Sequence, residues 1–226
     1  MKTLRSQTTF HVAILTSLLA VLLMASAFPS NANTAGTLLR LYSVAARDGW
    51  ILESTETSGV GGTMGAASAQ LSLGDNAQNK QYRAILHFNT GSLPDNAVIT
   101  GAWIFVKRAY SVGTDPFTAG HGVLNVDTAT PNGIFGSSGA LQLVDFNAMG
   151  GNSGYFVEWP QVDGIWYRAT LNVWGLSNIN RVGPTQYRLR FSVDDDNNHV
   201  ADILKIYSGE SSLALRPQLA VQYHLP

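Results

Sequence analysis

Apolar residues recur at every second position in several short segments of the chain. The clearest are residues 82–88, 165–173 and 187–193. A period of two places one side of each segment on a dry face and the other on a wet face, which is typical of β-strands. We expect strands at residues 38–45, 49–54, 70–74, 82–90, 97–109, 122–128, 154–159, 164–173, 185–194, 202–208 and 216–224.

The segments between these strands are rich in Gly, Asn, Asp and Pro, as in folds made of many short strands. Residues 140–148 and 174–180 look helical but are short, and the Gly-rich stretch 58–65 is interpreted as a mobile loop. We therefore predict an all-β protein with one or two short helices. Its expected architecture is a single two-sheet β-sandwich of jelly-roll type.

The N-terminus has the pattern of a secretory signal peptide. Lys2 and Arg5 precede an apolar run from Val12 to Met24, and the small residues Ala25-Ser26-Ala27 follow. The apolar run is shorter than the roughly 20 residues that cross a bilayer. We expect a signal peptide at residues 1–27, with a second acceptable cut after Ala32, and one domain at 34–226. The product is predicted to be secreted, extracellular or at the cell surface, with no membrane span after cleavage.

Charge and cysteine content exclude several classes of function. The signal holds two of the 14 basic residues and none of the 15 acidic ones, so the mature chain is mildly acidic. It lacks the basic field that holds nucleic acid, and we expect no nucleic-acid partner. The chain has no cysteine, which excludes disulfides and thiolate metal sites. An exported fold of this kind depends on its core or on a bound metal ion.

The wet faces of three predicted strands carry a set of arginines together with a tryptophan. If these strands are neighbours, the guanidinium groups could bind carboxylate or sulfate while the indole stacks on a sugar ring. The alternative is that these side chains solvate the sheet and pair with Asp or Glu. The candidate ligand-binding residues are Arg83, His87, Trp166, Arg168, Arg188 and Arg190.

An acidic segment follows the predicted strand at 185–194. Asp194, Asp196 and Asn198 place oxygen ligands at alternate positions of a turning loop, and Asp202 follows. This chemistry suits a structural Ca²⁺ ion, although the loop is not an EF-hand. The alternative is a solvated acidic turn.

Two stretches resemble the secreted DNRLRE-type modules. They are Gln81–Thr90 continuing through Ser92–Ala102, with its Ser-Leu-Pro-Asp-Asn-Ala-Val-Ile-Thr-Gly-Ala run, and the closing Arg216–Tyr223. The resemblance implies a jelly-roll-like sandwich on bacterial extracellular proteins, some of whose relatives bind acidic polysaccharides such as alginate. The name-giving motif is replaced here by Asn79-Lys80-Gln81-Tyr82-Arg83, so only Arg83 is a matched position.

The leading hypothesis is a secreted, non-catalytic module that binds an acidic cell-surface or matrix polysaccharide. One alternative is a structural protein of the envelope or extracellular matrix. A second is a polysaccharide lyase or hydrolase, in which Arg83 and His87 would act on a uronate. Enzyme signals are poor, because the histidines lack zinc-triad spacing and Gly136–Ala140 departs from a nucleophile elbow.

Overall fold

The computed structural model describes residues 36–226, which belong to one compact unit. The expected signal peptide and its cleavage sites lie outside the described residues. The strands are β1 (Thr37–Tyr42), β2 (Gly49–Glu53), β3 (Gly61–Ala66), β4 (Gln70–Asp75), β5 (Gln81–Phe88), β6 (Val98–Val112), β7 (Leu124–Ala129), β8 (Gly150–Gln161), β9 (Gly164–Thr170), β10 (Thr185–Phe191), β11 (Asp202–Tyr207) and β12 (Gln218–His224). The helical turns are η1 (Ala45–Arg47), η2 (Thr90–Ser92), η3 (Leu143–Phe146), α2 (Val173–Ser177) and η4 (Leu213–Leu215).

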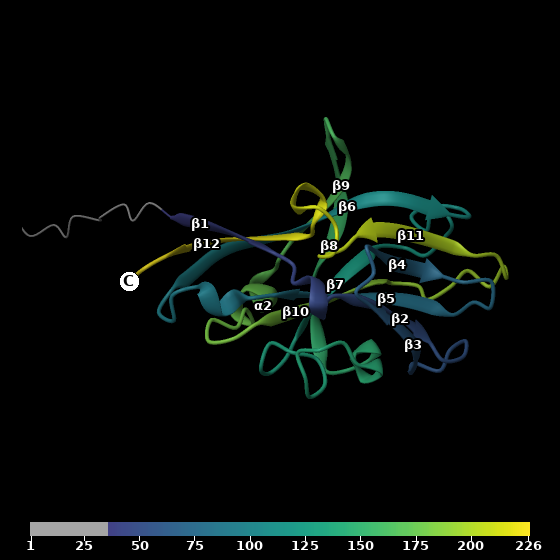
Figure 1. Cartoon of the computed structure of the whole chain (residues 1–226), viewed down its shortest axis with the longest axis horizontal. Helices are drawn as coiled ribbons and strands as arrows, with labels where there is room; N and C mark the ends of the chain where they lie inside the picture. The colour runs from purple at the N-terminus through teal and green to yellow at the C-terminus, as the bar shows by residue number, and fades with distance from the viewer. Residues whose placement is uncertain (1–35) are drawn as a thin grey trace, which may run out of the picture. The chain divides into compact units, whose positions relative to one another are not determined.

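The expected all-β class is confirmed, with 48% of residues 36–226 in strands and 9% helical. The expected two-sheet jelly-roll sandwich is wrong. Hydrogen-bonded pairing runs β6-β11-β4-β5-β10-β7-β8-β9 and returns to β6, so eight strands close into a barrel. β12 and β1 extend from β6, whereas β2 and β3 extend from β5 (Figure 1).

The length of β6 explains the closure. This 15-residue strand pairs with β9 and β12 along its first part and with β11 along its last part. A period-two pattern identifies a strand and its faces but contains no information about which neighbour each part will pair with. The sequence therefore predicted the strand but could not predict that it changes partners and closes the ring.

β3 is a strand that the sequence interpretation missed, because Gly61–Ala66 has no apolar alternation and was expected to be a loop. It pairs with β2. A Cβ at Gly65 would lie 2.5 Å from the Trp50 ring, and one at Gly62 would lie 2.4 Å from the Ser54 backbone. These glycines allow the close approach that the pairing requires.

The main core fills the barrel and comes from the predicted dry faces. Leu86 and Phe88 of β5, Ile104 of β6 and Tyr187 and Phe191 of β10 are fully buried. Burying each such side chain contributes about 1.5–3 kcal/mol. The apolar residues whose alternation predicted the strands therefore also stabilise the fold. Among residues 36–226, no helix combines the length and the apolar content needed to cross a bilayer.

A second, smaller hydrophobic cluster lies outside the barrel. The segment between β7 and β8, which includes η3, folds over the outer face of β2, β5 and β10 and lies at the bottom of Figure 1. Its Phe135, Leu141 and Phe146 pack against Ile51 and Ile85. The outer face of these strands is therefore dry, which determines the environment of the arginines on it.

Candidate functional site

The structure does not bring the six candidate ligand-binding residues onto one face. Arg83, His87, Arg188 and Arg190 lie on the adjacent strands β5 and β10. Trp166 and Arg168 lie on β9, which pairs with neither of them. The predicted set therefore divides into a covered group on β5 and β10 and a second group on β9.

Arg188 and Arg190 are occupied by internal contacts. Arg188 is 5% exposed, and its Nη2 lies 3.0 Å from the Asp127 carboxylate. Its Nη1 donates to the carbonyls of Asp145 and Ala148, and its guanidinium lies 4.8 Å from the centre of the Phe135 ring. Arg190 Nε donates to the same Asp127 oxygen at 2.9 Å. Both arginines point away from the barrel, but the segment before β8 covers Arg188.

Arg83 and His87 are constrained in a similar way. The Arg83 guanidinium stacks on Phe146 at 3.9 Å and donates to the Phe146 carbonyl and to Gln81. Burial, with the charges of Arg188 and Arg190, lowers the Arg83 pKa to about 10. His87 is 8% exposed, and burial together with the charge of Arg47 lowers its pKa. The Arg83 contacts with Phe146 help to hold the covering segment in place, whereas His87 Nδ1 is buried without a hydrogen-bond partner.

An open surface with different chemistry lies on the outside of β1, β12, β6, β9 and β8, which pair in that order. Residues that oppose one another across these strands form rows on the outer face, such as Gln218, Phe105, Arg168 and Val157. The next row places Trp166, which is only 7% exposed, opposite the more exposed Trp159. We call this surface the aromatic face; it comprises Arg40, Phe105, Trp159, Trp166, Arg168 and Gln218.

Two shallow hollows lie along the aromatic face. The first has a volume of about 420 Å³ and is lined by Arg40, Phe105, Trp159, Gln161, Asp163, Trp166 and Gln218. The second has a volume of about 520 Å³ and is lined by Asn152, Gly154, Tyr155, Val157, Arg168, Thr170 and Asn172. The Arg168 guanidinium stacks 3.8 Å from the centre of the Trp159 ring. Because Trp159 lines one hollow and Arg168 the other, the stacked pair joins them.

Polar groups of the first hollow are held by defined contacts. Lys107 Nζ lies 2.7 Å from Asp163, and the Trp166 indole donates to the other oxygen of the same carboxylate at 3.2 Å. The Lys107 hydrogen bond is the main cause that lowers the Asp163 pKa. Arg40 donates to Gln218 at 3.4 Å. Within residues 36–226, the Arg168 guanidinium forms no ion pair or hydrogen bond, and its Nε is buried without an acceptor.

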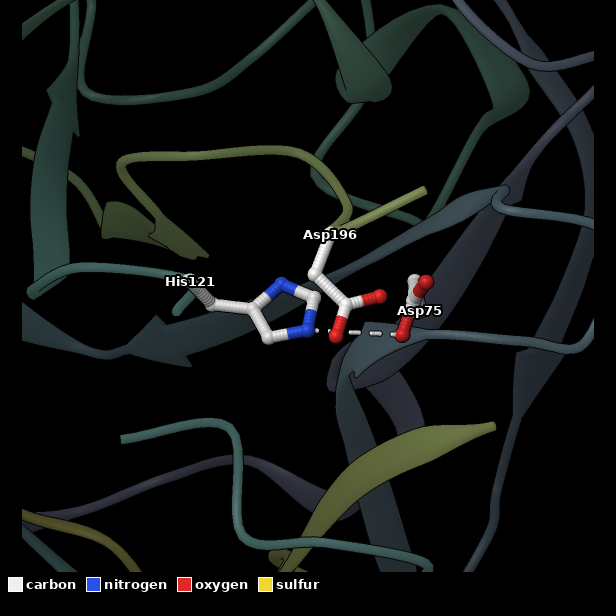
Figure 2. Close-up of side chains that lie close together, drawn as sticks. All are labelled: Asp75, His121 and Asp196. Carbon is white, nitrogen blue, oxygen red and sulfur yellow. Dashed lines mark ion pairs between the residues drawn. The ribbon is translucent and has the colours of Figure 1, made fainter. Parts of the chain in front are cut away.

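A partly buried polar cluster lies where the end of β4 meets the β6–β7 and β10–β11 loops. It brings together Asp75, His121 and Asp196, whose nearest ligand atoms all lie within 4.8 Å of one another (Figure 2). His121 Nε2 is 3.5 Å from Asp75 Oδ1, and both side chains are fully buried. Sequence reasoning missed this cluster, because its three members are far apart in the chain and have no characteristic spacing.

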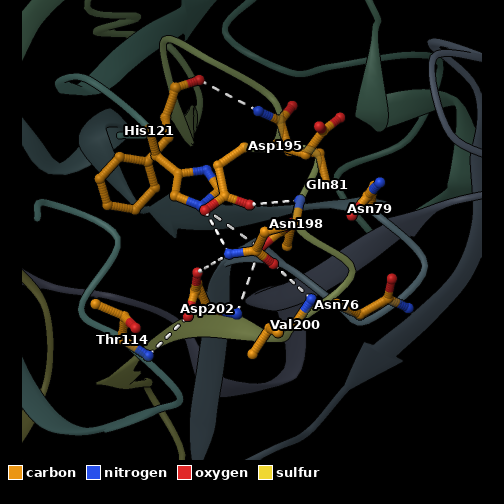
Figure 3. Close-up of polar contacts among 12 residues, drawn as sticks. Asn76, Asn79, Gln81, Thr114, His121, Asp195, Asn198, Val200 and Asp202 are labelled. Atoms are coloured by element: carbon orange, nitrogen blue, oxygen red, sulfur yellow. Dashed lines mark hydrogen bonds and ion pairs between the residues drawn. The ribbon is translucent and has the colours of Figure 1, made fainter. Parts of the chain in front are cut away.

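The four residues predicted to bind Ca²⁺ have different environments, and Figure 3 shows two of them, Asn198 and Asp202. Asp194 is exposed, whereas Asp196 is half-buried and belongs to the cluster with Asp75 and His121. Asn198 donates to Asp196 at 2.6 Å and to Asp202 at 3.4 Å. Asp202 is fully buried and accepts the Thr114 N–H at 2.7 Å. Hydrogen bonds within the loop thus use several of the expected oxygens, and calcium binding stays a prediction.

A scan against protein-family models found no match, and a search of curated proteins found no significant relative. The resemblance to DNRLRE-type modules therefore stays a prediction that rests on the sequence stretches quoted for it.

Proposed function

We propose that the protein is a secreted, non-catalytic module that binds an acidic polysaccharide along the aromatic face. The observation that supports this proposal best is the Arg168–Trp159 pair between the two hollows. A guanidinium without a protein partner can bind a carboxylate bidentately, and an indole offers an apolar surface to a sugar ring.

The shape of the surface suits a chain rather than a small compact ligand. Each hollow is shallow and open, and the two are joined end to end by the stacked pair. The first hollow adds the side-chain amides of Gln161 and Gln218, which can donate to and accept from hydroxyl groups. The second adds Asn152, Asn172 and Tyr155, which have similar capacity. Repeated sugar units could occupy consecutive positions along this surface.

The test is affinity electrophoresis and calorimetry with the mature protein against polyuronates such as alginate and pectate, and against a neutral glucan. We expect retention by the polyuronate and weaker retention by the glucan. Trp159→Ala and Arg168→Ala should each reduce polyuronate affinity by roughly tenfold to 100-fold, in line with the loss of an aromatic or arginine anchor. Circular dichroism of each variant checks that the fold persists.

Two exposed residues outside both hollows serve as matched controls. Tyr110 is 47% exposed on β6, and Arg47 is exposed in η1. Tyr110→Ala and Arg47→Ala should leave the affinity unchanged. Equal losses in the controls would indicate nonspecific charge or aromatic effects. Absence of retention by every polysaccharide would contradict the proposal and favour a structural envelope protein that contacts other proteins.

A further inference from the structure

The His121 imidazole is buried in the described structure without the hydrogen bonds that a buried histidine normally makes. Its side chain is fully inaccessible to solvent, and neither Nδ1 nor Nε2 has a hydrogen-bond partner among residues 36–226. A neutral imidazole has one donor and one acceptor to satisfy, and buried polar groups are rarely left without partners. The centre of the His121 ring lies 5.8 Å from the centre of the Phe191 ring, so the two rings pack against each other.

Asp75 also lacks a hydrogen-bond partner at one of its two carboxylate oxygens. Its Oδ2 is buried without a partner, while its Oδ1 accepts the Asp202 N–H at 3.3 Å and lies 3.5 Å from His121 Nε2. Asp75 Oδ1, His121 Nε2 and the Asp196 carboxylate face the same small region (Figure 2).

The surroundings supply negative charge but no balancing lysine or arginine. Within residues 36–226, Asp75 forms an ion pair only with His121, and Asp195, Asp196 and Asp202 form none. Asp195 and Asp202 are themselves buried. Several carboxylates this close together repel one another in a medium of low dielectric. A divalent cation would offset that repulsion and give His121 Nε2 the partner that it lacks.

We propose that Asp75, His121 and Asp196 bind a divalent transition-metal ion of the zinc class, through His121 Nε2 and one oxygen of each carboxylate. An imidazole nitrogen suits Zn²⁺ and its neighbours in the first transition series, whereas Ca²⁺ prefers oxygen ligands. This site differs from the calcium loop expected from the sequence, because it includes Asp75 and His121 and excludes Asp194. It is separate from the aromatic face.

The spacing of the ligand atoms is compatible with such an ion. Bonds of about 2.0–2.1 Å in a tetrahedral site place neighbouring ligands about 3.3 Å apart. His121 Nε2 and Asp75 Oδ1 are already 3.5 Å apart, and an Asp196 oxygen lies within 4.8 Å of both. Asn198 donates to Asp196 and the Asp202 N–H donates to Asp75, as the outer partners of metal-bound carboxylates do.

The proposed ion would connect three segments at one end of the barrel. Asp75 ends β4, His121 lies between β6 and β7, and Asp196 lies between β10 and β11. A chain without disulfides gains stability from an ion that binds only the folded state. Three protein ligands leave a position for water.

The experiment uses the mature protein after chelation, titrated separately with Zn²⁺ and Ca²⁺ by calorimetry and thermal unfolding. We expect one Zn²⁺ per chain and a raised midpoint, with a much smaller effect of Ca²⁺. Asp196→Asn should weaken Zn²⁺ binding by roughly 100-fold or more, beyond the loss typical of an outer partner. Asp194→Asn, an exposed change in the same loop, is the matched control and should bind Zn²⁺ like the wild type.

His121 is tested in two ways because its replacement could prevent folding. His121→Gln should abolish Zn²⁺ binding if the variant folds. In the wild-type protein, bound Co²⁺ should give the strong visible absorption of a four-coordinate site, and His121 ring nitrogens should shift in NMR spectra on Zn²⁺ addition. Absence of Zn²⁺ binding, equal losses in Asp194→Asn and Asp196→Asn, or a response to Ca²⁺ alone would each overturn the proposal.

Discussion

The outer faces of β10 and β9 carry arginines at equivalent alternating positions but in opposite circumstances. Arg188 of β10 lies beneath the segment that contains η3 and is paired with Asp127. Arg168 of β9 lies on an open surface, and its guanidinium has no protein acceptor in the described part of the chain. The comparison teaches that alternation identifies the side of a strand that faces away from the core, while solvent access depends on what else packs there.

The difference also concerns what each arginine can do. Arg188 and Arg190 both contact the Asp127 carboxylate, and Arg188 also donates to two backbone carbonyls. Arg188 therefore fixes the covering segment, and few of its N–H donors are free to bind a ligand. Arg168 keeps its donors and is oriented by stacking on Trp159. If this assignment is correct, the two arginines should respond oppositely when stability and binding are measured side by side.

The largest expected effect follows from removing Arg188. Arg188→Ala should lower the free energy of unfolding by about 3–5 kcal/mol, because it leaves a buried carboxylate poorly compensated and two buried carbonyls without their donor. Urea denaturation measures the change. Arg188→Met should lose nearly as much, since it restores apolar volume but no donor. A loss below about 1 kcal/mol would show that this face is already solvated and would remove the contrast.

A smaller effect is expected from the aromatic cover above Arg188. Phe135→Leu should cost about 1–2 kcal/mol, because it removes ring volume from the small cluster and the stacked contact with the guanidinium. Leu143→Ala, a change of a 38% exposed side chain in η3, is the matched control and should cost much less. Equal losses in the two variants would indicate that the whole segment unfolds as a unit.

The strands of the covered region and their core-facing residues could be predicted from the sequence. The segment between β7 and β8 that packs over their outer face could not. The alternation of β5 and β10 correctly placed Tyr187 and Leu189 in the core. The burial of Arg188 depends on Phe135 and Asp145, which lie more than 40 residues earlier in a segment without a clear period. Side-chain periodicity reports local structure, whereas such contacts depend on the path of the chain.

The aromatic face and the proposed metal site show the same limit of prediction from the sequence. The candidate pair Trp166 and Arg168 was found from the sequence, but Trp159 as its partner requires the β8–β9 register. Asp75 and Asp202 become neighbours only through the pairing of β4 with β11. His121 then joins them from a loop that no pattern distinguishes. Residue types suggested the chemistry, and strand pairing decided which residues meet.

The covered region should also respond to pH. Asp145 is fully buried, and this burial raises its pKa to about 6, above its ordinary value of 3.8. Between these values the folded protein binds more protons than the unfolded chain, so this group makes stability fall as the pH rises from about 4 to 6. At about 1.4 kcal/mol per pKa unit, the full change is at most about 3 kcal/mol.

Asp145→Asn should remove this part of the pH dependence. One Asp145 oxygen accepts the Gln142 N–H at 2.8 Å and the other has no partner, so the amide can keep the existing bond. Unfolding curves at several pH values compare the slopes of variant and wild type. An unchanged slope would assign the dependence to other buried carboxyl groups, such as Asp48, whose pKa burial raises to about 7.

The smallest effect on the free energy of unfolding is expected for Arg168→Ala, although this change should strongly reduce polysaccharide binding. Arg168→Ala removes a stacked guanidinium at a partly exposed site, a contact that contributes about 0.5 kcal/mol. It also removes a buried Nε that lacks an acceptor, which offsets part of that loss. We expect an unfolding curve within about 0.5 kcal/mol of the wild type together with the loss of polyuronate binding. Arg168→Lys keeps the charge but loses the planar, bidentate group, so it should restore only part of the affinity. A large loss of stability in Arg168→Ala, or full binding by it, would mean that the arginine of the open face is structural like that of the covered one.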